Sequence, residues 1–215
     1  MESLANQDGL FVIHDLIDTI QANKAYLSEI DGAIGDGDHG INMNKGFTLC
    51  RERLGASRAD LAAGLKTLGR VLLMEIGGSM GPLYGTFFME LSKAAAAKEQ
   101  IDKTIFAEML AAALTGVQAL GNAKVGDKTL LDTLVPAVEA YRAAVAGGAG
   151  FGAALEQMEA AAAKGKESTR DLVAKVGRAS RLGERSRGVL DAGAVSCYLI
   201  LASMAKSLTG YLAEV

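Results

Sequence analysis

Three aspartates separated by glycines form the stretch of this sequence with the most evident chemistry. They are Asp31, Asp36 and Asp38, and they fall within eight residues. Carboxylates this close repel one another unless protons or a cation offset their charge. Hard oxygen ligands on a flexible turn suit Mg²⁺ or Ca²⁺, whereas zinc prefers cysteine and histidine. The stretch therefore predicts a metal site; the alternative is one helix-capping aspartate beside two solvated ones.

Three familiar motifs fit this chain only in part. The segment GDGDHG has the spacing G-x-G-x-x-G, but a helical stripe rather than a strand precedes it. An EF-hand starting at Asp36 would lack its turn glycine and its bidentate glutamate. The segment GNAKVGDKT resembles a Walker A loop, yet an aspartate stands before the lysine and no strand leads in. We therefore set all three motifs aside.

The elements that must position these residues are helices, because apolar residues recur at helical spacing almost throughout the chain. We expect eight helices joined by short connections, with neighbours antiparallel and no strands. A bend or a weakened turn is expected at Pro136, and Ser57 with Asp60 has the spacing of a capping box. The expected helices lie at about residues 10–30, 39–50, 61–72, 83–91, 106–120, 131–141, 151–176 and 192–212.

Alternate connections of an up-and-down bundle lie at the same end, and here the two ends differ in composition. One set of connections is rich in glycine, acids and basic residues: EIDGAIGDGDHG, EIGGSMGP, GNAKVGDKT and VGRASRLGERSRGVLDAG. The other set carries nothing comparable: RLGASR, AAAAKEQ and AVAGGAGF. The asymmetry predicts a composite ligand site at one end of the bundle.

Composition narrows the classes of protein. The chain is 50% hydrophobic and 22% charged, the balance of a soluble globular protein, and we expect residues 1–215 to form a single domain. A net charge of −3 offers no basic footprint for nucleic acid. Cys50 and Cys197 are isolated and predict buried thiols in a reducing compartment. There is no secretory signal, and no stretch approaches the roughly 18 uninterrupted apolar residues of a membrane span. We expect a cytoplasmic protein without a membrane partner.

Taken together, the glycine-rich blocks resemble the ADP-binding L subunit of bacterial dihydroxyacetone kinases. The resemblance covers essentially the whole chain, in the family's order and spacing. It rests on IGDGDHGINMNKGF, GGSMGPLYGTFF, GDKTLLDTLVPAVEA, GRASRLGERSRG and DAGA. It implies an all-α fold, an eight-helix antiparallel up-and-down barrel with the nucleotide at the rim where the four polar connections meet.

The resemblance also implies cofactors and residue roles. Asp31, Asp36 and Asp38 would hold two Mg²⁺ ions that bridge the phosphates of ADP or ATP. Together with Arg178, which could fork onto phosphate oxygens, they would be the catalytic residues. The implied nucleotide contacts are His39, Asn42, Ser79, Met80, Gly121, Leu130, Arg178, Asp191 and Gly193.

The sequence departs from the family pattern at several of these positions. Ser79-Met80 stands where two small residues are usual, and Ala192 replaces the proline of the usual DPGA. Arg181 and Arg187 make the last polar connection more basic. Because residues 178–191 carry few apolar side chains, we expect them to form a mobile lid over the site.

The function implied is that of an ADP/ATP-carrying phosphotransferase subunit, inactive without its partner. A separate K subunit would hold dihydroxyacetone, and an M subunit of the phosphotransferase system would rephosphorylate the bound ADP. The first alternative is an ATP-dependent kinase subunit acting on dihydroxyacetone or a related ketose such as erythrulose. Fatty-acid kinases share the module but carry long C-terminal extensions. A nucleotide-dependent regulatory partner of a transcription factor and a homodimer are further hypotheses.

Overall fold

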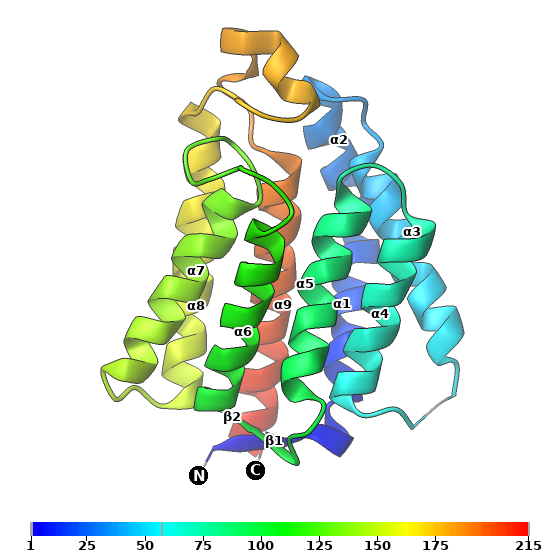
Figure 1. Ribbon diagram of the computed structural model, residues 1–215, viewed down its shortest axis with the longest axis vertical. Coiled ribbons are helices and arrows are strands. Elements are labelled where there is room, and N and C mark those ends of the chain that lie inside the picture. Colours follow the sequence, from blue (N-terminus) through cyan, green and yellow to red (C-terminus); the bar gives the residue numbers. More distant parts are fainter. Residues whose placement is uncertain (1, 57, 215) are drawn as a thin grey trace.

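Helices make up most of the computed structural model, which describes residues 2–56 and 58–214. Within these residues there are nine α-helices, and the all-α prediction is confirmed (Figure 1). The α-helices are α1 Leu10–Ala22, α2 Lys24–Ile34, α3 His39–Leu54, α4 Leu61–Glu75, α5 Met80–Ala95, α6 Lys103–Gln118, α7 Leu131–Ala146, α8 Phe151–Ser168 and α9 Ala192–Glu214. The shorter elements are the strands β1 Ser3–Ala5 and β2 Gln100–Asp102 and the 3₁₀ helices η1 Asn6–Asp8, η2 Thr169–Asp171 and η3 Arg178–Ser186.

The helix count differs from the predicted eight because the first expected helix is broken at Asn23. The Asn23 side-chain amide donates to the Thr19 carbonyl oxygen at 2.8 Å, and its backbone N–H bonds to the same turn. A short polar side chain that bonds the preceding turn competes with helix continuation. The chain therefore restarts as α2, which carries Asp31 toward the polar end of the bundle.

Smaller differences from the expected elements concern ends and strands. The helix α8 ends at Ser168 rather than near residue 176, whereas α7 continues through Pro136. The strands β1 and β2, which the sequence analysis did not predict, form a short antiparallel pair. The capping box predicted for Ser57 and Asp60 would put Asp60 at the third helical position. The structure instead makes Asp60 the N-cap of α4, where its carboxylate accepts the Ala63 N–H. Ser57 lies outside the described residues.

The bundle has one continuous apolar core, and α9 runs through it. This helix packs against α1, α2, α7 and α8, and its inward side chains are buried. It is also the helix in the described chain that is long and apolar enough to cross a membrane by length and composition, contrary to our expectation. Of the apolar stretch of α9, 61% is buried inside the molecule, so the place of this helix in the core accounts for its apolar character.

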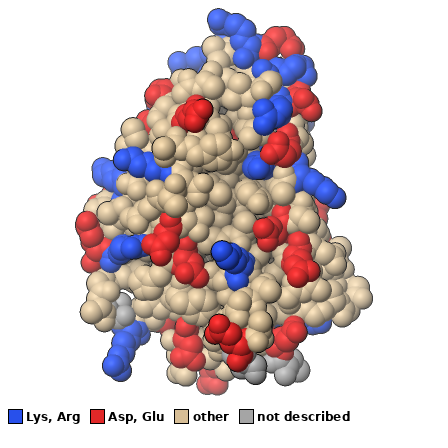
Figure 2. Space-filling view, turned by 180° about the vertical axis from the view of Figure 1, so that it is seen from behind, with Lys and Arg blue, Asp and Glu red and all other residues tan. Residues whose placement is uncertain are grey.

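The four polar connections lie at the same end of the bundle, as the up-and-down arrangement predicts. They are residues 35–38, 76–79, 119–130 and 169–191. Both chain termini and the β1–β2 pair lie at the opposite end (Figure 1). On the face turned away in Figure 1, acidic and basic side chains are interspersed along the length of the molecule (Figure 2).

Candidate functional site

A pocket of about 680 Å³ opens among the four polar connections. Each connection contributes to its lining, and so do the helix ends that flank them. The structure places all of the predicted site residues along this one pocket: Asp31, Asp36, Asp38, His39, Asn42, Ser79, Met80, Gly121, Leu130, Arg178, Asp191 and Gly193. Their convergence is a finding; the role of each in binding or catalysis stays a prediction.

The three aspartates converge on one side of the pocket. Asp31 lies in the last turn of α2 and the other two lie in the short connection to α3, and each offers a carboxylate oxygen within 4.8 Å of the others. A Cβ atom on Gly35 would overlap the Asp31 carboxylate, so the tight turn requires glycine here. The Asp36 and Asp38 side chains are 45% and 49% exposed. A set of three such oxygens fits a hard divalent cation such as Mg²⁺.

Arg178 reaches this carboxylate cluster from the far end of the sequence. It begins η3, directly after Gly177, whose φ of 71° is in the left-handed region that favours glycine. Its guanidinium group forms an ion pair with Asp36 and lies 3.9 Å from an oxygen of Asp38. One cationic side chain therefore stands beside the predicted metal ligands.

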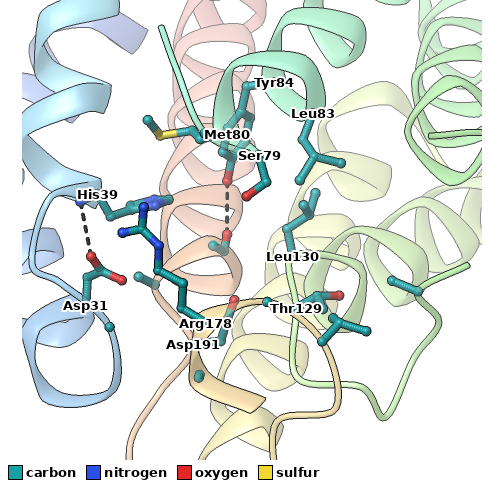
Figure 3. A pocket seen from close by; sticks show the side chains of 18 of the residues that line it. Asp31, His39, Ser79, Met80, Leu83, Tyr84, Thr129, Leu130, Arg178 and Asp191 are labelled. Carbon is teal, nitrogen blue, oxygen red and sulfur yellow. Dashed lines mark hydrogen bonds between the residues drawn. The ribbon is translucent and has the colours of Figure 1, made fainter. Parts of the chain in front are cut away.

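His39 connects the cluster to the core through a chain of hydrogen bonds. Its backbone N–H donates to Asp31 Oδ2 at 3.2 Å (Figure 3). Its Nε2 lies 2.9 Å from Ser196 Oγ. The Tyr84 hydroxyl lies 2.6 Å from the same Ser196 oxygen and donates to the Gly193 carbonyl oxygen. Burial lowers the pKa of His39 to about 4, against the opposing effect of Asp31, so the ring is neutral at pH 7.

The connection between α4 and α5 presents backbone rather than charged side chains to the pocket. Gly78 has a φ of 74°, and nothing lies within 4 Å of where its Cβ atom would be. Ser79 and Met80 follow at the start of α5, and Met80 is buried. An open glycine turn that leads into a helix N-terminus can bring free N–H groups close to an anion.

The side of the pocket away from the aspartates is apolar. Its lining residues are Leu83, Val117, Leu120, Ala123, Leu130 and Leu131. Leu83 and Leu130 lie across the pocket from Asp31 and Arg178 (Figure 3). One end of the pocket can therefore take a flat apolar group while the other takes a charged one.

Asp191 lies on the floor of the pocket, directly before α9. Its Oδ2 accepts the Ala194 N–H at 2.7 Å, which caps the first turn of that helix. Burial raises its pKa to about 7, although Lys128 and the Ala194 N–H favour the ionised form. Ala192, which stands where the family has proline, is buried in this first turn.

The expected lid is smaller than the predicted residues 178–191. Ser186 is fully buried, and its hydroxyl oxygen accepts the Ala174 N–H at 2.9 Å. The Gly188 N–H donates to the Arg170 carbonyl oxygen, and Leu190 is 5% exposed. These anchors confine the loosely held part to residues 177–185. Arg187 bonds to Glu184 and to the Asp171 carbonyl oxygen and belongs to the anchored part.

Sequence reasoning missed several residues of the pocket. One is Tyr84, which lines the pocket; Ser196 does not line it but bonds to Tyr84 and His39. Both stand at core positions of α5 and α9, and nothing in their spacing separates them from ordinary interior residues. Leu83, Val117, Leu120 and Leu131 were read as helix stripes for the same reason, whereas Leu130 was predicted as a nucleotide contact. Lys128 also lines the pocket. The segment GNAKVGDKT drew attention to this lysine, but once the Walker A motif was set aside the sequence suggested no other role for it.

The sequence has clear relatives among known proteins. It is 38% identical over 189 residues to the ADP-binding subunit DhaL of the PEP-dependent dihydroxyacetone kinase of Escherichia coli, covering 87% of this chain and 90% of that protein. It is 39% identical over 193 residues to the ADP-binding subunit DhaL of PEP-dependent dihydroxyacetone kinase 1 of Listeria innocua, with 89% and 91% covered. Against the L-erythrulose kinase of Pectobacterium atrosepticum it is 33% identical and spans 32% of that protein.

Solved structures share the fold. The native dihydroxyacetone kinase of C. freundii superposes with a TM-score of 0.70 at 24% identity, over 95% of this chain and 35% of that one. The same enzyme in complex with AMP-PNP and Mg²⁺ gives a TM-score of 0.68 at 22% identity. The sequence model of the DAK2 domain matches residues 33–206, which include Asp36 and Asp38 of the aspartate cluster, the glycine turn and the η3 segment; Asp31 lies just before this range. The chain therefore belongs to the DAK2 domain family, and to the branch that contains the ADP-binding subunits of dihydroxyacetone kinases.

Proposed function

We propose that this chain carries ADP or ATP and transfers its phosphoryl group to dihydroxyacetone held on a separate K subunit. The observation that carries the proposal is the division of one pocket into a carboxylate side and an apolar side. Asp31, Asp36 and Asp38 line the first, and Leu83 and Leu130 line the second. A metal-bound polyphosphate needs the carboxylate side, and a purine base needs the apolar side.

The carboxylates are the proposed metal ligands. Asp31, Asp36 and Asp38 would hold two Mg²⁺ ions, which would neutralise phosphate charge when bound. Because the backbone N–H of His39 fixes one oxygen of Asp31, that carboxylate is already oriented. The hydrogen bond between His39 Nε2 and Ser196 holds the imidazole ring against α9. The ring would thus border the phosphates without adding a charge at neutral pH.

The remaining predicted contacts are assigned by their places in the pocket. Asn42, Ser79, Met80 and the glycine turn would surround the phosphates and ribose, and Gly121 and Leu130 the base. Gly193 and Asp191 would form the floor, where a larger side chain at Gly193 would meet the Asp191 carboxylate and Leu130.

Phosphoryl transfer depends mainly on positioning and on neutralising charge in the transition state. Arg178 is the proposed catalytic cation. Its guanidinium group is planar and presents paired donors that match phosphate oxygens. It sits on the segment 177–185, which borders solvent, so it can approach the transferred group from the side open to a partner subunit.

For the phosphoryl donor we propose an M subunit of the phosphotransferase system, which would recharge ADP in place. The relatives named as ADP-binding subunits of PEP-dependent kinases are matched over nine-tenths of their length. The second candidate is direct use of ATP on dihydroxyacetone or erythrulose, which the likeness to an erythrulose kinase favours. We further propose that residues 1–215 form a single domain that acts in the cytoplasm and is inactive alone.

Native mass spectrometry of the freshly purified protein tests the proposal most directly. We expect a mass increase equal to ADP plus magnesium, which is lost after prolonged dialysis against EDTA. Isothermal titration with Mg-ADP should then restore one nucleotide per chain. A protein that neither retains nucleotide nor binds added Mg-ADP would refute the proposed function.

A further inference from the structure

Lys128 has a backbone conformation and a burial that are both unusual for lysine. Its φ is 64°, and it is the non-glycine residue with positive φ in the described parts of the chain. Its side chain is also buried, with 2% of the residue exposed. Lysine is rarely buried without a partner, and a left-handed backbone is unfavourable for it. Something in the structure must hold this residue in place.

The ammonium group meets three backbone carbonyl oxygens. Nζ lies 2.6 Å from the oxygen of Thr169, 3.2 Å from that of Leu172 and 2.5 Å from that of Val189. An ammonium group has three N–H donors, so these three acceptors use all of them. Lys128 therefore has no donor left for a phosphate, although it lines the pocket and stands in a loop that resembles a Walker A motif.

The three carbonyls belong to the α8–α9 connection, residues 169–191, whereas Lys128 belongs to the α6–α7 connection. On the lysine's side the next residues are Thr129 and Leu130, which line the pocket. In the α8–α9 connection, Val189 stands two residues before Asp191, and it is Asp191 that lies on the pocket floor. The lysine thus joins the wall of the pocket to its floor.

A backbone bond reinforces the same junction: the Lys175 N–H donates to the Asp127 carbonyl oxygen at 3.1 Å. Within the α8–α9 connection, the Asp191 N–H donates to Thr169 Oγ1 at 3.0 Å, which ties the pocket floor to a residue whose carbonyl oxygen accepts from Lys128. Gly193 adjoins the same wall, because a Cβ atom at this position would lie 3.6 Å from the backbone nitrogen of Leu130. The positions of wall and floor therefore depend on one another through a few contacts, and Lys128 makes three of them.

We propose that Lys128 is a positioning residue that fastens the α8–α9 connection to the nucleotide pocket, and that it does not bind phosphate. Its ammonium charge is balanced by three backbone carbonyl dipoles of the protein. Lys128 therefore influences a bound nucleotide indirectly, by holding Leu130, Asp191 and Gly193 in place. The part of this inference that concerns nucleotide affinity rests on the proposed function. The fastening itself does not.

Hydrogen–deuterium exchange without nucleotide, followed by titration with Mg-ADP, tests both parts. In Lys128→Met we expect the amides of Lys175, Gly188 and Asp191 to exchange at least about tenfold faster, since three carbonyls lose their donor. Amides in the middle of α3 and α5 should be unchanged. We expect Mg-ADP to bind about tenfold more weakly, and Lys128→Gln, which keeps two donors, to fall between. The matched control is Lys175→Met, which removes an exposed lysine that pairs with the buried Asp127 carboxylate at the same junction. That carboxylate keeps its bond from the Lys124 N–H, so both readouts should change less than about twofold.

The outcomes separate the possible roles of Lys128. Weaker nucleotide binding with unchanged exchange would make Lys128 a phosphate ligand and overturn the inference, as would no change in either readout. Global unfolding of both the Met and Gln variants would assign it to the stability of the whole bundle and overturn it too. Faster exchange in a protein whose wild type binds no Mg-ADP would support the fastening while refuting the proposed function.

Discussion

Arg178 on η3 forms an ion pair with Asp36 in the connection between α2 and α3, and this pair joins two solvent-exposed parts of the pocket. The two side chains are 58% and 45% exposed, and ion pairs in such surroundings contribute little free energy. Phosphate and metal ions can therefore rearrange this contact at low cost. The residues around Arg178 should respond when nucleotide binds.

Limited proteolysis with trypsin follows that response. We expect cleavage after Arg181 and Arg185 to slow in the presence of Mg-ADP, because phosphate oxygens would hold Arg178 and with it the segment 177–185. Cleavage after Arg187, whose side chain is bonded to the Asp171 carbonyl oxygen, should be slow in both states. Arg178→Met is the control, and it should remove most of the protection. Equal cleavage after Arg181 with and without nucleotide would contradict a nucleotide-ordered segment.

The cluster of Asp31, Asp36 and Asp38 predicts variants that lose nucleotide affinity without losing stability. In Asp36→Asn and Asp38→Asn we expect Mg-ADP affinity to fall by at least about tenfold, since each variant removes one anionic ligand. The helical circular dichroism and the melting temperature should stay close to those of the wild type, because both side chains are exposed and relief of repulsion offsets lost contacts. Asp18→Asn, which removes an exposed aspartate paired with Arg51, is the matched control for nucleotide binding. Calorimetry on the three variants decides, and unchanged affinity in the first two would refute the metal assignment.

Asp191 predicts a dependence of stability on pH in the metal-free protein. Burial raises its pKa in the folded protein to about 7, from an ordinary value of 3.8. Between these values the folded state binds more protons than the unfolded state, so Asp191 destabilises the fold increasingly as pH rises toward 7. Above pH 7 the effect is constant. The charged groups that face it are Lys128, Asp132 and Asp31.

Asp191→Asn should remove this penalty while keeping an oxygen to cap α9. Urea denaturation in EDTA at several pH values measures the difference in unfolding free energy between variant and wild type. We expect the difference to grow in favour of Asn by roughly 2 kcal/mol between pH 5 and pH 8 and then to level off. A difference that is flat across this range would show that Asp191 is ionised at pH 5 in the folded state.

How far sequence could go is clearest at the two ends of the pocket. Asp31, Asp36 and Asp38 could be found because their charge is concentrated in a short glycine-rich stretch, and such a stretch has few structural uses. It could also be predicted that the four polar connections meet at one end of the bundle, because successive helices are antiparallel. The core helices could be predicted because apolar spacing records which face is buried.

Other features depend on contacts that spacing does not record. The break at Asn23 rests on one side-chain bond to Thr19, which competes with a helical pattern that continues on both sides. The anchored half of the expected lid rests on Ser186, which meets the Ala174 N–H only after the chain has turned back. The burial of Lys128 could not be predicted for the same reason, because its three carbonyl partners come from another connection. Polar residues that bond across the fold look like surface residues in sequence.

The identity of the phosphoryl donor predicts how long the nucleotide must stay bound. If an M subunit recharges ADP in place, the nucleotide is a cofactor and must survive many turnovers. That requires slow dissociation, the rate in which differences of affinity usually appear. Direct use of ATP requires the opposite, because release of ADP is then part of every cycle.

The pocket has features that favour slow dissociation. Four connections surround it, Lys128 fastens wall to floor, and Arg178 stands over the carboxylate side. We therefore expect this chain, mixed with a K subunit, dihydroxyacetone and excess free ATP but no M subunit, to give a burst of about one sugar phosphate per bound nucleotide. Addition of phosphorylated M subunit should then restore continuous turnover. Sustained turnover with ATP as the sole phosphoryl donor, measured as continued formation of sugar phosphate, would instead establish the ATP-dependent reaction. Lys128→Met separates affinity from chemistry in the same assay: a loosened pocket should exchange ADP faster and so turn over more on ATP, although it binds nucleotide more weakly.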